Sequence, residues 1–160
     1  MANAKDIILT QEGVEQLNKE YRHLIDVERP AVIEALQNAR AMGDLSENAD
    51  YDAARNKQAE IEGRINEIEA ILANAKVVSD AGKSKTINIS NTVTFLDLST
   101  NEEVTVKIVS SIESDPISDP NNIKISNVCA LGEALIGHKV GEEITVKAVH
   151  PYKIKVISFK

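Results

Sequence analysis

Two carboxylates, Asp44 and Glu47, stand three residues apart in the acidic run GDLSEN, residues 43–48. In a turn that leads into a helix, this spacing can direct both side chains the same way. Mg²⁺ prefers oxygen ligands, usually keeps several waters, and often shares one or two protein carboxylates with a phosphate. Two acids are too few for a tight site of their own. They can complete a metal site whose other ligands come from a partner, where the metal would activate water for phosphodiester hydrolysis.

The same run also fits a simpler interpretation, a solvated bend between two helices. Acids in the first turn of a helix offset its dipole, which accounts for Asp50 and Asp52 without any ligand. Arg40 and Arg55 flank the run, one on each side, and could engage a phosphate or a carboxylate of a partner. Charge and spacing alone leave both interpretations open.

The rest of the chain offers no competing catalytic pattern. His23, His138 and His150 are scattered, and none pairs with Cys129 at a spacing typical of a metal site or an activated nucleophile. The single cysteine excludes an intrachain disulfide, and we interpret it as a small buried residue. No Gly-rich phosphate loop or Ser-His-Asp pattern is recognisable.

Composition limits the class of protein. The 160 residues suit one ordinary domain or two small ones, and a hydrophobic content of 42% supports a packed core. Residues 1–78 hold 9 Lys/Arg against 15 Asp/Glu, so a bare phosphate backbone would be repelled and autonomous DNA binding is disfavoured. With one cysteine, no signal peptide and no membrane-spanning run, we expect a soluble cytoplasmic protein.

The first part of the chain is helical by its hydrophobic period. Thr10 can cap a helix whose apolar seam repeats at 3-4-3 spacing from Val14 to Leu24. Beyond Pro30 the stripe continues through Val32, with its phase slipped by one residue. A proline removes one backbone bond and kinks a helix, and we attribute the slip to such a kink.

A second helix carries the longest heptad seam in the chain. Ser46 or Asn48 can serve as its N-cap. Two helices of roughly 30 residues joined by a short link predict an antiparallel hairpin with arms of roughly 45 Å. The seam of the second helix consists of Tyr51, Ala54, Gln58, Ile61, Ile65, Ile68, Leu72 and Ala75.

The period of the sequence changes in its second half. The heptad pattern is lost from Val77 onward, so we assign residues 1–78 to the hairpin, residues 79–85 to a linker and residues 86–160 to a second domain. That domain alternates apolar and polar residues, which predicts strands around one short helix, a small α+β domain. The strands are expected at Thr92–Leu98, Glu103–Val109, Ile123–Ser126, Ile144–Val149 and Lys153–Phe159, the helix at Ala130–Ile136, and a loop at Ser114–Asn122.

Two stretches of the sequence resemble the GreA/GreB family of bacterial transcript cleavage factors. RAMGDLSENADYDAARNKQAEIEGRI, residues 40–65, is similar to the family's tip and second helix. ISNVCALGEALIGHKVGEE, residues 125–143, looks like its C-terminal strand, short helix and turn. The resemblance implies an α+β protein with an N-terminal antiparallel α-helical coiled-coil hairpin, whose acidic tip lies at residues 43–50. It also implies a small C-terminal β-sheet domain similar to FK506-binding proteins.

The resemblance further implies a function and a partner. Members dock on RNA polymerase through the globular domain and insert the coiled coil into the secondary channel. There they stimulate the polymerase's own cleavage of the 3′ end of backtracked nascent RNA. Such a factor is not an enzyme by itself, has no cofactor of its own, and acts with Mg²⁺ at the polymerase active site. We expect a monomer, without a metal in the isolated protein, of the GreA type, because a concentrated basic patch along the coil is missing.

The family's functional residues map onto this sequence one by one. Its two essential tip acids fall on Asp44 and Glu47. Two departures stand out: Asp52, where many members have a basic or aromatic residue, and Cys129-Ala130, where Ser-Pro is common. Further contacts to polymerase or RNA near the tip are expected from Arg40, Asn48, Tyr51 and Arg55, and docking contacts from Ser126, Cys129 and Leu131.

Two other functions fit parts of the pattern. Some relatives enter the channel and inhibit transcription with a more acidic tip; Asp50 and Asp52 favour this alternative, whereas the retained Asp44 and Glu47 argue against it. The C-terminal fold also suggests a peptidyl-prolyl isomerase or a chaperone. Isomerases of that fold line their pocket with aromatic side chains, and this domain offers only Phe95, Tyr152 and Phe159.

Overall fold

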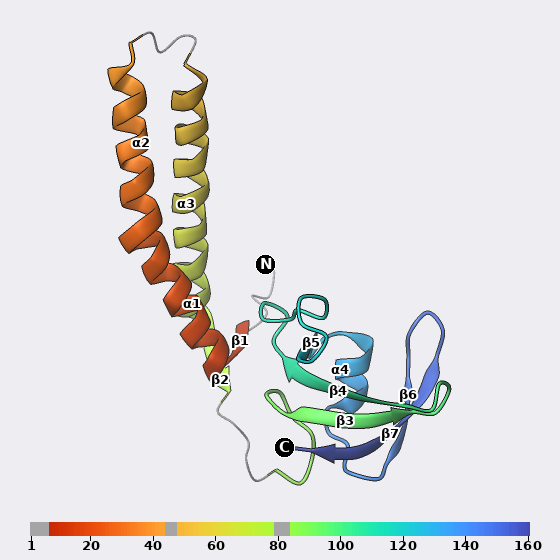
Figure 1. Cartoon of the computed structure of the whole chain (residues 1–160). Coiled ribbons are helices and arrows are strands. Elements are labelled where there is room, and N and C mark those ends of the chain that lie inside the picture. The colour runs from red at the N-terminus through yellow and green to blue at the C-terminus, as the bar shows by residue number, and fades with distance from the viewer. Residues whose placement is uncertain (1–6, 44–47, 79–83) are drawn as a thin grey trace, which may run out of the picture. The chain divides into compact units, whose positions relative to one another are not determined.

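The computed structural model describes residues 7–43, 48–78 and 84–160 (Figure 1). They divide into two units: Val14–Ala75 forms the body of one, and Ile8–Gly13 with Lys76–Lys160 forms the other. The first is a helical hairpin and the second is built on a five-stranded sheet. The predicted α+β fold class is therefore confirmed.

The helical unit consists of two antiparallel arms that lie side by side (Figure 1). The first arm is one continuous helical path of three segments, and the second is a single helix. Thr10 caps the first arm as predicted, because its Oγ1 accepts a hydrogen bond from the Gly13 N–H at 3.0 Å. The segments are α1 (Gln11–His23), the π-helix η1 (Leu24–Glu28), α2 (Arg29–Ala41) and α3 (Ala49–Asn74).

The buried side chains of the hairpin follow the predicted seam closely. Near the end of α3, however, the prediction of Leu72 is wrong by one residue. Ile71 is buried and Leu72 is only half-buried. The buried seam comprises Leu17, Val32, Leu36, Ala39, Ala54, Ile61, Ile65, Ile68 and Ile71.

The phase slip that the sequence places at Pro30 occurs one turn earlier, in η1. Arg29 donates its backbone N–H to the carbonyl oxygen of Leu24, five residues back. Pro30 itself lies in the first turn of α2, directly after η1 in the continuous arm, and its missing N–H adds no residue to the helix. The attribution of the slip to a proline kink is corrected accordingly.

The second unit is a mixed sheet in the order β5-β4-β3-β7-β6. Only the β4–β5 pair is parallel; the other three pairs are antiparallel. The predicted strands are present, although the strand expected at Ile144–Val149 ends at Val146. The elements are β3 (Thr92–Asp97), β4 (Glu102–Val109), β5 (Ile123–Ser126), α4 (Ala130–Leu135), β6 (Glu143–Val146) and β7 (Tyr152–Phe159).

The core of this unit lies between α4 and one face of the sheet (Figure 1). Gly132 is essential to this packing, since a Cβ there would lie 2.2 Å from the backbone oxygen of Ser126. Gly137 ends the segment after α4 with a φ of 87°, a conformation that suits glycine. The fully buried core side chains include Ile87, Val93, Ile108, Leu135, Val146, Ile154 and Val156.

A two-stranded sheet, β1 (Ile7–Thr10) with β2 (Ala75–Val78), was not anticipated. Val77 and Val78, where the heptad pattern is lost, belong to β2. Residues 79–83 of the expected linker lie outside the described residues. Pairing between strands 68 positions apart leaves no local period in the sequence, which is why both were missed.

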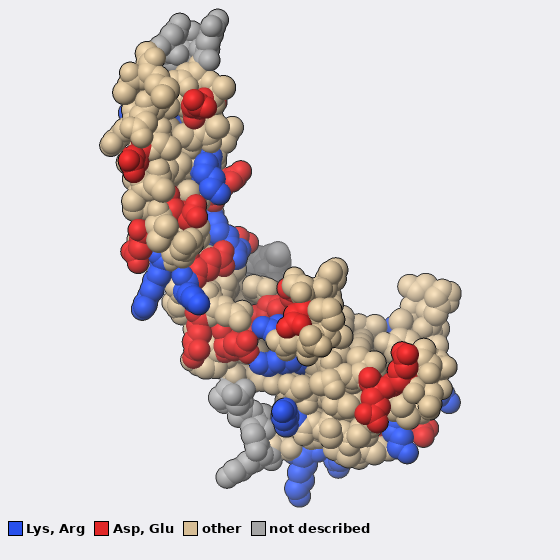
Figure 2. Space-filling view, viewed as in Figure 1, with Lys and Arg blue, Asp and Glu red and all other residues tan. Residues whose placement is uncertain are grey.

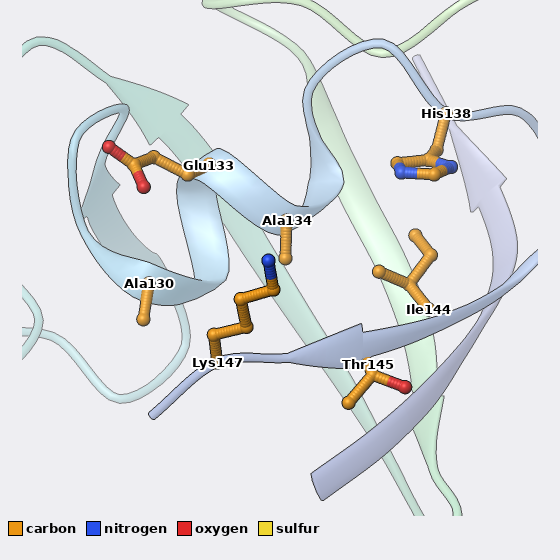
Figure 3. A pocket seen from close by; sticks show the side chains of 7 residues that line it. All are labelled: Ala130, Glu133, Ala134, His138, Ile144, Thr145 and Lys147. Carbon is orange, nitrogen blue, oxygen red and sulfur yellow. The ribbon is translucent and has the colours of Figure 1, made fainter. Parts of the chain in front are cut away.

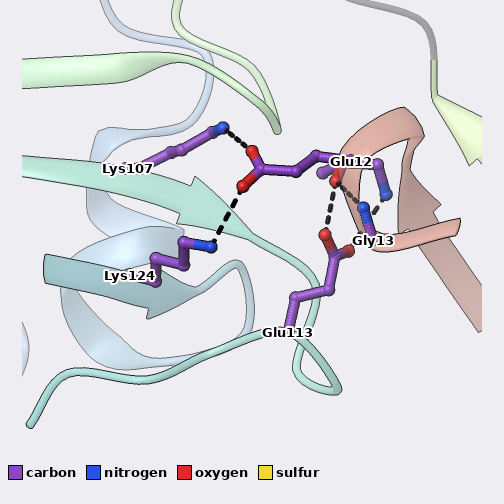
Figure 4. A network of polar contacts seen from close by, with 6 residues as sticks. Glu12, Gly13, Lys107, Glu113 and Lys124 are labelled. Atoms are coloured by element: carbon purple, nitrogen blue, oxygen red, sulfur yellow. Dashed lines mark hydrogen bonds and ion pairs between the residues drawn. The ribbon is translucent and has the colours of Figure 1, made fainter. Parts of the chain in front are cut away.

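Two carboxylates fasten residues 8–13 within the second unit (Figure 4). Glu113 accepts hydrogen bonds from the Thr10 N–H at 3.0 Å, from the Thr10 hydroxyl, and from the Ser110 hydroxyl at 2.7 Å. Thr10 and Ser110 are 2% and 3% exposed, so these donors have little access to water. Glu12 binds the ammonium groups of Lys107 and of Lys124, the latter at 3.2 Å.

We expect Glu12 to stabilise the protein only above acidic pH. The hydrogen bond from Lys107 lowers the pKa of Glu12 from the ordinary 4.5, and the bond from Lys124 adds to this against an opposing effect of burial. Because the folded-state pKa is depressed, the stabilisation is complete above the unfolded-state pKa and is lost as the pH falls through the lowered value. Urea unfolding at pH values from 7 to 3 measures this. The free energy of unfolding should fall less steeply with decreasing pH in Glu12→Gln than in the wild type.

The exposed Glu102→Gln provides the matched control for this measurement. It should keep the acid-side slope of the wild type. An unchanged slope in Glu12→Gln would mean that the ion pairs to Lys107 and Lys124 contribute nothing to stability.

Candidate functional site

The two tip acids, Asp44 and Glu47, lie outside the described residues. The structure does describe the two helix ends on either side of them. Helix α2 ends at Ala41 and is followed by Gly43 with a φ of 106°. That left-handed conformation favours glycine and turns the chain away from the helix axis.

Asn48 joins the two helix ends by itself. Its Oδ1 accepts a hydrogen bond from the Tyr51 N–H at 3.1 Å and so caps α3, as predicted. Its Nδ2 donates to the carbonyl oxygen of Ala39 at 2.7 Å, across the hairpin. One side chain thus satisfies an unpaired donor of α3 and an acceptor at the end of α2. The sequence analysis missed the bond from Asn48 to Ala39. The residue type could have indicated it, because among the common N-cap residues only Asn carries both a strong acceptor and an NH₂ donor.

Arg40 and Arg55 converge on Tyr51 from the two arms. The Arg40 guanidinium lies 5.7 Å from the centre of the Tyr51 ring. Hydrogen bonding to Arg40, and secondarily to Arg55, lowers the pKa of the Tyr51 hydroxyl. Both arginines are exposed, so this cluster can offer positive charge and hydrogen-bond donors to an anionic group of a partner.

The environment of Tyr51 should make it the first of the three tyrosines to ionise. A hydrogen bond to Glu69 raises the pKa of Tyr21, and burial raises that of Tyr152. An NMR titration of the ring carbons checks this order. Arg40→Gln should move the Tyr51 pKa upward, because it removes the largest cause of the shift, and the exposed Arg22→Gln serves as the control. Ionisation of Tyr51 after Tyr21 would contradict the described contacts.

The neighbouring acids have a structural explanation. Asp50 and Asp52 are exposed in the first turn of α3, where negative charge opposes the helix dipole. In residues 7–43, 48–78 and 84–160, no group of three or more His, Cys, Asp or Glu side chains could hold a metal ion. A metal at this tip would therefore need ligands from outside the described part of the chain.

Two arginines of the coil are engaged by glutamates of the opposite arm. Arg29 holds Glu62 through two bonds of 2.7 and 2.5 Å, and Arg64 holds Glu20 through two bonds of 2.7 and 2.9 Å. Figure 2 shows acidic and basic side chains interspersed along the hairpin on the face in view. The guanidinium groups of both arginines are therefore paired with carboxylates inside the hairpin.

The residues expected to dock on a partner meet where β5 ends and α4 begins. Cys129 is half-exposed and caps α4, since its Sγ accepts a hydrogen bond from the Gly132 N–H at 3.3 Å. The interpretation of Cys129 as a simply buried residue is corrected by this role. Ser126 accepts a hydrogen bond from the Val128 N–H at 3.2 Å, and Leu131 packs against the core. Val128 beside them is 59% exposed.

A pocket of about 430 Å³ lies between α4 and β6 (Figure 3). Figure 3 shows Ala134 and Ile144 facing each other across it, with the Lys147 ammonium reaching toward Ala134. No Phe, Tyr or Trp lines the pocket, because Phe95 is buried in the core and Tyr152 and Phe159 pack against that core. The aromatic lining expected of a proline isomerase is therefore missing. The lining residues are Ala130, Glu133, Ala134, His138, Ile144, Thr145 and Lys147.

None of the helices in the described ranges combines the length and the hydropathy that crossing a bilayer requires.

Comparison with known proteins covers both units of the chain. Residues 7–77 match a family model described as transcription elongation factor, N-terminal, and residues 82–160 match one described as transcription elongation factor, GreA/GreB, C-terminal. A solved structure of the GreA factor homolog Gfh1 of Thermus thermophilus is 25% identical, covers 98% of this chain and 99% of its own, and has a TM-score of 0.44, too low to support an argument.

Three relatives named transcription elongation factor GreA match over nearly their full lengths. The protein of Mesoplasma florum is 48% identical over 155 residues, which cover 96% of this chain and 97% of the relative. That of Mycoplasma mycoides subsp. mycoides SC is 48% identical over 160 residues, covering 98% and 99%. That of Caldanaerobacter subterraneus subsp. tengcongensis is 45% identical over 159 residues, covering 98% and 99%.

Proposed function

Because the chain belongs to the GreA/GreB family of transcription elongation factors, we propose that it stimulates the RNA cleavage activity of RNA polymerase. The sheet unit docks on the polymerase and the helical hairpin enters the secondary channel. Its tip then reaches the 3′ end of the nascent RNA in a backtracked complex. The factor acts as a monomer in the cytoplasm and has no catalytic centre of its own.

The observation that carries this proposal is the bridge made by Asn48. With its bonds to Tyr51 and Ala39, it ties together the two helix ends that flank residues 44–47. Fixing the two flanking helix ends to each other lowers the entropy that is lost when a partner binds Asp44 and Glu47 between them. A merely solvated bend would not need both ends to be fixed to each other.

The donor set at the tip fits Mg²⁺ shared with a partner. Two carboxylates suit a hard cation that keeps other ligands, such as Mg²⁺ with its bound waters. When bound between polymerase and factor, Mg²⁺ would supply an activated water for hydrolysis of a phosphodiester. Asp44 and Glu47 would hold that ion, while Arg40 and Arg55 would bind and orient phosphate groups beside it.

RNA cleavage in a halted, backtracked elongation complex tests this proposal. The factor should increase the rate at which the 3′ fragment is released and let the complex resume synthesis. Inhibition of synthesis without cleavage would instead support the alternative of a channel-binding inhibitor. A proline-isomerisation assay in parallel should show no strong turnover, and strong turnover would place the function in the α4–β6 pocket.

A further inference from the structure

The π-helix η1 is the one irregular turn in an otherwise regular first arm. Residues on both sides of it keep right-handed helical geometry: His23 has φ/ψ of −61°/−43° and Arg29 of −61°/−49°. The bond from the Arg29 N–H to the Leu24 carbonyl closes a ring wider by one residue than an α-turn. The arm is therefore continuous, but it contains one residue more than an α-helix of the same number of turns.

That additional residue is visible in the packing. Leu24 and its neighbour Ile25 both pack against the cluster of Val32, Ile61 and Ile65, and they lie eight and seven residues before Val32. Eight residues of α-helix rotate by about 800°, which is about 80° past two full turns, so Leu24 and Val32 would not share the seam of a regular helix. Seven residues fall only about 20° short of two turns and would stay on it. The π-turn removes the excess rotation.

Both flanks of η1 are fastened to α3 by two-bond Arg–Glu contacts. Upstream, Glu20 of α1 is held by Arg64 at 2.7 and 2.9 Å. Downstream, Arg29 of α2 holds Glu62 at 2.7 and 2.5 Å. The excess residue is thus confined between two fixed points. Val27, in the middle of the turn, points its side chain toward solvent with 52% exposure.

Pro30 does not explain the turn. A proline removes a backbone donor and restricts the residue before it, but it adds no residue to the helix. Its absent N–H leaves the carbonyl of Asp26 without an α-helical donor, which makes the wider turn easier to adopt. The eight-residue spacing would remain if Pro30 were replaced.

We propose that Leu24–Glu28 sets the rotational phase of the hairpin. By absorbing one residue, the π-turn keeps α1 and α2 on the same face of α3, so that Ala39 meets Asn48 and Arg40 meets Tyr51. The turn positions the tip through the number of residues that it contains, not through the side chain of Val27. The inference deepens the proposed function and rests on it for its consequence in RNA cleavage.

Four variants of the full chain test the inference: deletion of Val27, Val27→Ala, Pro30→Ala, and one alanine inserted after Val27. The structural measurement is the NMR scalar coupling across the hydrogen bond between the Arg29 N–H and the Leu24 carbonyl. This coupling should persist in Val27→Ala and in Pro30→Ala. It should also persist on deletion of Val27, because the two groups then stand four residues apart and form an ordinary α-helical bond. The deletion restores the seven-residue spacing between Leu24 and Val32, and the melting temperature should not fall.

The functional measurement is the cleavage rate at a saturating concentration of the factor, together with the concentration that gives half of it. The deletion, Val27→Ala and Pro30→Ala should keep the wild-type maximal rate. The insertion adds about 100° of rotation that the packed seam cannot accommodate. It should lower the maximal rate about 100-fold, because misplacement of about 1 Å at a reacting centre can have that effect. The half-saturating concentration should stay unchanged, since docking uses the other unit.

Three results would overturn the inference: loss of the coupling in Pro30→Ala, a deletion variant that melts several degrees below the wild type, or full cleavage by the insertion variant. If the insertion variant does not fold, the coupling and the melting temperature of the deletion variant decide the matter. A wild-type factor that fails to stimulate cleavage would refute the proposed function instead, and the coupling would still decide whether the π-turn absorbs the residue.

Discussion

Combined replacement of Asp44→Asn and Glu47→Gln should lower factor-stimulated RNA cleavage by about 10²–10⁴-fold. Loss of a carboxylate that helps hold a catalytic metal removes several kcal/mol of transition-state stabilisation, roughly that range in rate. The amides keep the size of the side chains but lose the charge that binds the cation. The measurement is the single-turnover cleavage rate of a backtracked complex at saturating factor.

Binding and folding should be nearly unaffected in the same variant. The sequence predicts a polar turn at these two acids, and surface substitutions usually change stability by less than about 0.5 kcal/mol. The matched control is Asp50→Asn with Asp52→Asn, which removes the same charge from exposed positions in the first turn of α3 and should retain most of the cleavage. If the tip variant no longer competes with the wild type for polymerase, or if the control is equally inactive, the metal-holding role is wrong.

Glu113→Ala should lower the free energy of unfolding by about 2–4 kcal/mol. The substitution leaves the Thr10 N–H, the Thr10 hydroxyl and the Ser110 hydroxyl without their acceptor. A buried donor that loses its partner costs about 1–3 kcal/mol, and rearrangement of the freed hydroxyls recovers part of the sum. Urea unfolding followed by circular dichroism measures the change.

Gly13 provides an independent check on the same carboxylate. A Cβ at Gly13 would lie 2.2 Å from the carboxyl carbon of Glu113, so Gly13→Ala should destabilise the wild type. In the Glu113→Ala background the same change should cost much less, because the obstructing side chain is gone. Additive losses in this double-mutant cycle would show that the carboxylate and the glycine act separately.

Periodic patterns fixed much of the architecture in advance. The heptad seam from Ala54 to Ile68 predicted the second arm, and alternation in residues 92–109 predicted strands β3 and β4, because both depend on side-chain periods within one element. The resemblance of residues 40–65 to the GreA/GreB family is confirmed by the matches over both units. The family and the candidate tip residues were accessible without any coordinates.

Contacts between distant segments were decided only by the tertiary structure. The β1–β2 pair, the hold of Glu113 on Thr10, and the bond from Asn48 to Ala39 join residues that no local pattern relates. The one-residue slip in the seam was visible in the sequence, but its cause was not. A proline and a π-turn can both interrupt a heptad, and only the bond from Arg29 to Leu24 distinguishes them. Local periods reveal which face of an element is buried; partners across the fold depend on how the elements pack.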